Sequence, residues 1–123
     1  MNAQQRKTIQ AVIDSLQKFT EEDDVKEAGA EDTILALEAA KDMLESERDD
    51  EQEKFDNMPE GLQGSEKGEK MEQGISDLDT AIHELEDTAL AALDIKNLEN
   101  DWYVTVAHAV QYAIEAAESA IDN

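Results

Sequence analysis

The stretch that decides the fold runs from Met71 to Ala92 and reads MEQGISDLDTAIHELEDTALAA. Its apolar positions alternate spacings of four and three, at Met71, Ile75, Leu78, Ile82, Leu85, Ala89 and Ala92. This alternation is typical of a coiled-coil seam, in which one helix packs lengthwise on another. Gly74 lies beside the seam, where glycine weakens a helix by about 1 kcal/mol relative to alanine. We therefore expect a neighbouring helix to approach closely at Gly74.

Turn residues separate this predicted helix from the rest of the chain. The break before it contains Pro59, Gly61, Gly64 and Gly68, and Ser65 is a candidate N-cap. Apolar spacing predicts further helices at about 3–19, 31–57 and 101–121, with an acidic connector at 20–30 that holds one turn capped by Thr20. No strand pattern is present. We predict an all-α fold, a single acidic helical domain at 1–123 with about four helices, built around an antiparallel helix hairpin.

The second predicted helix has a weaker apolar pattern than the third. Ile34, Leu37, Leu44 and Phe55 follow a seven-residue repeat, which is interrupted by charged residues at Lys41, Arg48 and Glu51. The far half of this helix is therefore expected to bury little apolar surface.

The composition of the chain limits the kinds of partner and site that the protein can have. The 123 residues include 32 Asp or Glu and 10 Lys or Arg, for a formal net charge of −22. Such a surface repels nucleic acids and anionic membranes and attracts basic proteins. The absence of cysteine excludes disulfides and thiolate metal sites. No apolar run reaches membrane-spanning length, and residues 1–18 lack the apolar stretch of a secretion signal, so we expect a soluble cytoplasmic protein.

The acidic residues gather on one face of the helix predicted at 31–57. Six of them follow spacings of 4, 3, 4, 4 and 3, at Glu38, Asp42, Glu45, Asp49, Glu53 and Asp56. The row is roughly 27 Å long, with a carboxylate about every 5 Å. Duplex DNA carries a charge per about 1.7 Å of axis. Carboxylates on the flank (Glu47, Asp50, Glu51) and on the neighbouring helix (Glu72, Asp79, Glu86) raise the density towards that of DNA, so the array could mimic phosphates.

Two simpler explanations of the acidic stripe are a solvated helix face and adaptation to high salt. A purely solubilising surface mixes charges of both signs, whereas this chain has about three acids for each base. Eight of the ten basic residues are lysines, and we expect a salt-adapted protein to favour arginine instead. Both observations favour a surface selected for negative charge.

Other chemistry has little support in the sequence. His83 has Asp79, Glu86 and Asp87 at helical spacing, so a divalent metal could find ligands there, although such a histidine is more often simply exposed. No nucleophile and base pair, glycine-rich phosphate loop or cysteine is present, so we expect neither an enzyme nor a bound cofactor.

The predicted turn between the second and third long helices resembles a segment of other proteins. Residues 55–82 read FDNMPEGLQGSEKGEKMEQGISDLDTAI, and their most specific part is Asp56–Gln63 followed by Ser65, Glu66 and Gly68. The segment resembles small acidic helical proteins of bacteriophages and mobile elements, in which an Asp-Asn-Leu-Pro-Glu-Gly-Leu-Gln-like turn links two acidic helices. Met58 replaces the expected leucine, and Lys67 the expected arginine. The resemblance implies a phage or mobile-element origin and a structural turn, and it carries over no activity.

These features lead to three functional hypotheses. The first is an inhibitory protein that mimics nucleic-acid phosphates and blocks a basic nucleic-acid-binding host defence protein, such as a CRISPR effector or a restriction nuclease. The alternative is a structural or oligomeric scaffold, in which the seam or the apolar face between Tyr103 and Ile121 forms a homo-oligomer instead of completing the core. The third is a metal-dependent protein that uses His83. None of them involves direct nucleic-acid or membrane binding.

Overall fold

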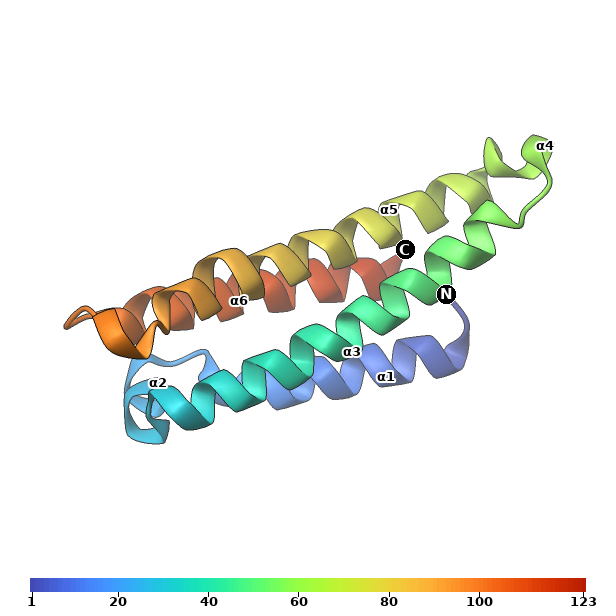
Figure 1. Ribbon diagram of the computed structural model, residues 1–123. Coiled ribbons are helices and arrows are strands. Elements are labelled where there is room, and N and C mark those ends of the chain that lie inside the picture. Colours follow the sequence, from blue (N-terminus) through green and yellow to red (C-terminus); the bar gives the residue numbers. More distant parts are fainter.

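The computed structural model describes all 123 residues and contains only helices (Figure 1). The helices are α1 (Ala3–Leu16), α2 (Glu22–Ala28), α3 (Ala30–Asp56), α4 (Glu60–Gln63), α5 (Glu66–His83) and α6 (Trp102–Asp122). A 3₁₀ turn at Gln17–Phe19 follows α1, a π-helical segment at Glu84–Leu90 continues α5, and a 3₁₀ turn at Ile95–Asn97 precedes α6. The predicted all-α class is confirmed.

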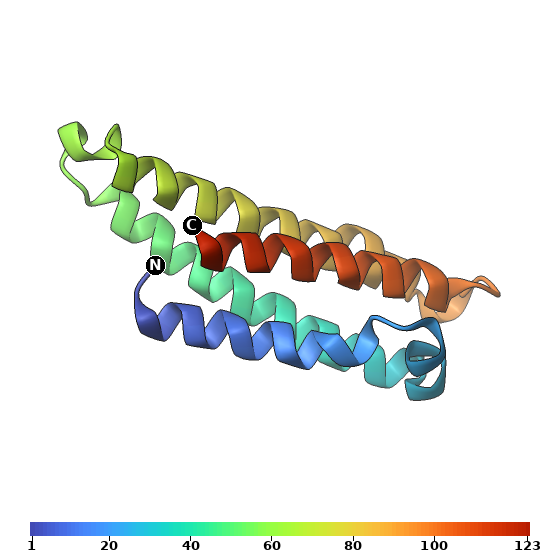
Figure 2. The ribbon, with the colours of Figure 1, turned by 180° about the vertical axis from the view of Figure 1, so that it is seen from behind.

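Four long helices form the bundle. Helix α1 contacts α3 and α6, and α5 contacts the same two helices from the other side. Figures 1 and 2 show that successive long helices run in alternating directions, with α2 at one end of the bundle and α4 at the other. At the α4 end, α3 and α5 extend beyond α1 and α6, so both chain termini lie between the two projecting arms.

The ends of the helices follow from local hydrogen bonds. Asn2 caps α1, because its side chain accepts from the Gln5 backbone NH at 2.8 Å while the Gln5 side chain accepts from the Asn2 NH at 3.0 Å. The expectation that Thr20 caps the connector helix is wrong. Its hydroxyl donates back to the Gln17 carbonyl at 3.1 Å, and α2 begins after Glu21 without a side-chain cap. Gly29 joins α2 to α3 with φ of +86°, a conformation that favours glycine.

The turn between α3 and α5 is held by its own polar side chains. The Gln63 amide donates to the carbonyls of Phe55 at 3.0 Å and Met58 at 3.3 Å, which satisfies the C-terminal end of α3. Ser65 caps α5 as predicted, accepting from the Gly68 NH at 3.3 Å. Gly68 lies within α5 and not in the break, and a Cβ at this position would collide with the Gln63 carbonyl. The fold of α4 onto α5 therefore requires this glycine.

The core is one cluster of 22 buried residues to which all four long helices contribute. The predicted seam is buried from Met71 to Ala89, and Ala92 is half-buried. A Cβ at Gly74 would lie 3.8 Å from the Ala120 carbonyl oxygen of α6, an ordinary van der Waals distance, and the closest contact, at 3.2 Å, would be with the methyl carbon of Met1 and not with a neighbouring helix. The apolar face of α6 is buried in the same cluster, and it completes the core of this chain. No helix combines the length and apolar character needed to span a bilayer.

Candidate functional site

The predicted acidic stripe lies on the solvent side of α3. Glu38, Asp42, Asp49, Glu53 and Asp56 are exposed, and Glu45 is half-buried. The opposite side of the helix buries Leu37, Ala40 and Leu44 in the core. The register of α3 is fixed by that burial, so the stripe is held facing outward along the length of the helix.

Two carboxylates of α5 join the stripe across a shallow groove. The groove has a volume of about 330 Å³ and is lined by Gln52 and Phe55 of α3 and by Glu72, Ile75, Ser76 and Asp79 of α5. The Gln52 amide donates to Asp56 at 2.9 Å, which directs this amide along α3. We call the combined surface the acidic face: Glu38, Asp42, Glu45, Asp49, Glu53 and Asp56 with Glu72 and Asp79.

Arg48 lies within the acidic face and links its two helices. Its Nη1 donates to Asp79 at 2.8 Å, and its Nε and Nη2 both donate to one oxygen of Asp49, at 3.2 and 3.1 Å. The Asp79 hydrogen bond, helped by Asp49, raises the pKa of the Arg48 guanidinium. Two of the predicted binding carboxylates are thus paired within the protein although both side chains stay accessible to solvent, and the Asp79 pair links α3 to α5.

Two further carboxylates of the predicted set have lysine partners on their own helix. Glu45 lies 3.7 Å from the Lys41 ammonium, and Asp50 lies 3.8 Å from that of Lys54. The predicted carboxylates without an ion-pair partner are Glu38, Asp42, Glu53, Asp56, Glu72 and Glu86.

Two members of the predicted set lie off the acidic face. Asp50 is one residue beyond Asp49, hence about 100° further round the helix, and it pairs with Lys54 on that side. Glu86 is exposed, in the π-helical segment beyond the groove. The array that α3 and α5 bring together is therefore shorter than the sequence predicted.

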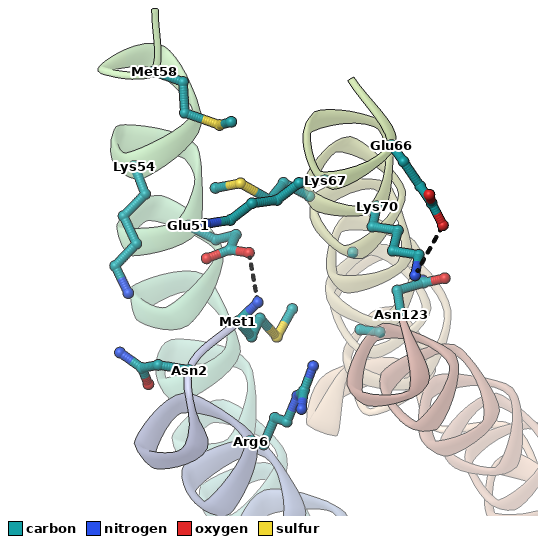
Figure 3. A pocket seen from close by; sticks show the side chains of 13 residues that line it. Met1, Asn2, Arg6, Glu51, Lys54, Met58, Glu66, Lys67, Lys70 and Asn123 are labelled. Carbon is teal, nitrogen blue, oxygen red and sulfur yellow. Dashed lines mark ion pairs between the residues drawn. The ribbon is translucent and has the colours of Figure 1, made fainter. Parts of the chain in front are cut away.

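The expectation that Glu51 flanks the acidic face is wrong. Its side chain is 1% exposed, and one carboxylate oxygen lies 3.1 Å from the α-ammonium group of Met1, a residue that is half-buried (Figure 3). The other oxygen accepts from the Gln5 amide at 3.4 Å. Glu51 continues the buried column of Leu37 and Leu44 at seven-residue spacing, and this repeat was the available sequence signal.

The neighbouring carboxylate of Glu47 is half-buried. Burial, and then the negative charge of Asp50, raise the pKa of Glu47. It therefore resists ionisation more than an ordinary glutamate does.

His83 has no metal-binding arrangement around it. Its Nδ1 lies 2.8 Å from the Asp79 carbonyl oxygen one turn earlier, and the ring is exposed. No group of three or more His, Cys, Asp or Glu side chains is placed to hold a metal ion.

Comparison with protein-family models, with curated proteins and with solved structures finds no match for this chain.

Proposed function

We propose that this protein is an inhibitory binding protein whose acidic face occupies the nucleic-acid-binding surface of a basic partner. The observation that carries the proposal is the acidic face itself, with eight carboxylates on two adjacent helices of a chain with a net charge of −22. Lysine and arginine side chains that normally bind phosphates would bind these carboxylates through charge-assisted hydrogen bonds.

The rigidity of the face supports phosphate mimicry. The buried side of α3 fixes the orientation of its stripe, and the ion pair between Arg48 and Asp79 links α3 to α5. A carboxylate array that is already in place loses little conformational entropy on binding, which favours affinity. Carboxylates and phosphates both release counterions when they meet lysine and arginine, so binding should weaken steeply with salt.

The hairpin turn, together with the one-sided charge, favours one class of partner. Residues 55–82 resemble acidic proteins of phages and mobile elements, whose hosts defend themselves with nucleases that hold DNA or RNA in basic channels. A CRISPR effector or a restriction nuclease is therefore the partner class that we propose, and the host cytoplasm is the site of action. The scaffold alternative has less support, because the apolar face of α6 is buried within the chain and the exposed large apolar residues (Leu35, Met43, Leu62, Ile95, Tyr112) are spread over the molecule.

A competition assay tests the proposal. Fluorescent DNA is bound to a panel of purified defence nucleases, including a CRISPR effector and a restriction endonuclease, and its anisotropy is followed as this protein is added. We expect displacement of DNA from at least one nuclease at low ionic strength. Direct binding of that nuclease to this protein, measured without DNA, should weaken at least tenfold between about 50 and 200 mM salt, as phosphate contacts do.

Two variants of equal net charge distinguish an effect of the acidic face from an effect of the protein's total charge. The face variant, E38Q/D42N/E53Q/D56N, neutralises four exposed carboxylates of α3 that have no ion-pair partner. The matched control, D14N/E115Q/E118Q/D122N, neutralises four exposed carboxylates on α1 and α6. The face variant should lose displacement while the control retains it. Absence of displacement by the parent protein, or equal loss in both variants, would refute the proposal.

A further inference from the structure

The rare basic side chains of this acidic protein gather around one hollow. Arg6 of α1, Lys54 of α3, and Lys67 and Lys70 of α5 line a space of about 800 Å³ at the end of the bundle where the termini lie (Figure 3). These are four of the ten Lys and Arg residues in the chain. The hollow lies between the projecting arms of α3 and α5, at the ends of α1 and α6.

Two of these four cations have no partner of their own. Lys70 pairs with Glu66 at 3.4 Å, and Lys54 donates to the Gln5 side chain at 2.8 Å. Arg6 and Lys67 form neither an ion pair nor a side-chain hydrogen bond. In Figure 3, Arg6 enters the hollow from α1 and Lys67 extends into it from α5.

Two carboxylates line the hollow, Glu51 and Glu66, and each is paired with another cation, Glu66 with the Lys70 ammonium at 3.4 Å. Glu51 is already paired with the Met1 ammonium at 3.1 Å and is buried. An anion between Arg6 and Lys67 would therefore meet two positive charges that the protein does not neutralise, and arginine can hold a carboxylate through two parallel hydrogen bonds.

The rest of the lining contains the polar residues Asn2, Glu51, Glu66 and Asn123, and it has an apolar part. The side chains of Met1, Met58, Met71 and Ala120 line it, together with Gly74. Methionine is flexible and polarizable, and it adapts to apolar ligands of varied shape. A ligand that fits this surface has an anionic head and an apolar body.

The net charge of −22 limits the charge of that ligand. Repulsion from the rest of the protein grows with the charge of the incoming anion, so nucleic acids and acidic proteins are disfavoured relative to a singly charged molecule. We propose that the hollow binds a small organic anion, with a carboxylate or sulfonate head between Arg6 and Lys67 and an apolar body against the three methionines. This site is distinct from the acidic face: its binding side chains are cations, and it lies in the hollow near the chain termini.

Calorimetric titration of the full chain with decanoate, decanol and inorganic phosphate tests this site. We expect saturable binding of decanoate, with decanol and phosphate binding at least tenfold more weakly, because each lacks one half of the ligand. The variant R6Q/K67Q should weaken decanoate binding at least tenfold. The matched control K7Q/K18Q removes two exposed cations that lie outside the hollow, and it should bind decanoate like the parent.

Since Arg6 and Lys67 are exposed and unpartnered, R6Q/K67Q should fold like the parent. Decanoate should also raise the urea midpoint of the parent and of K7Q/K18Q but not that of R6Q/K67Q, since a ligand stabilises the state that it binds. The proposal is overturned if decanoate does not bind, if decanol or phosphate binds as tightly as decanoate, or if both double variants weaken decanoate equally.

Discussion

Replacing Glu51 with glutamine should destabilise the protein strongly, although the chain carries 31 other acidic residues. The substitution leaves the Met1 ammonium, which lies 3.1 Å from the carboxylate in the parent, without an ionic partner. Removing one member of a buried ion pair costs about 3–5 kcal/mol. Because Met1 as a whole is only half-buried, water can reach its ammonium, and we expect a loss at the lower end, about 3 kcal/mol.

Urea unfolding at neutral pH, followed by helical circular dichroism, measures this loss. With a slope of about 2 kcal/mol per molar urea, a loss of about 3 kcal/mol lowers the midpoint by roughly 1.5 M. Glu53→Gln is the matched control, because it makes the same chemical change two residues away, at an exposed carboxylate without an ion-pair partner. Its midpoint should stay the same or rise slightly as self-repulsion falls. Equal midpoints for the two variants would refute the assigned role of Glu51.

Three further substitutions test the fold and its electrostatics. Gly68→Ala should cost about 1–3 kcal/mol, because its Cβ would collide with the backbone of the preceding turn, whereas Gly61→Ala meets open space and should not destabilise; equal urea midpoints would contradict this. Arg48→Gln should cost about 1 kcal/mol at low salt and less at high salt in thermal unfolding, since the exposed part of its ion pairs is screened; a salt-independent loss would contradict it. The raised pKa of Glu47 means that its ionised form opposes folding, so Glu47→Gln should be more stable than the parent at neutral pH. That advantage should disappear as the pH falls below the ordinary glutamate range, where both side chains are neutral, and its persistence in urea titrations at acid pH would contradict the assignment.

The long helices could be predicted from the sequence because their signals are local. The apolar spacing from Met71 to Ala89, the stop at Pro59 and the cap at Ser65 each act within a few residues, and the structure places the corresponding helices close to the predicted bounds. The short helix α4 and the position of Gly68 inside α5 were missed. They depend on the packing of the turn against α5, which no local pattern encodes.

The candidate site was predictable to a similar degree. The α3 stripe followed from spacing alone, because residues three and four apart share a helix face. The partners of its carboxylates did not follow, since Arg48 reaches Asp79 across a separation of 31 residues. The burial of Glu51 was missed because its partner is far away in sequence: it is the ammonium of Met1, which directly precedes the N-cap of α1. The cationic hollow likewise forms only when the ends of all four long helices meet.

Whether carboxylates on α3 and α5 imitate a phosphate backbone is measured by neutralising them. DNA displacement from a defence nuclease is followed for the parent protein, for E38Q/D42N/E53Q/D56N and for D14N/E115Q/E118Q/D122N, and the direct affinity of the parent for the nuclease is measured without DNA at low and at physiological salt. We predict displacement by the parent and by the α1 and α6 control, loss of displacement by the α3 variant, and a direct affinity that falls steeply with salt. Retention of full displacement by the α3 variant, or direct binding that is indifferent to salt, would contradict this function.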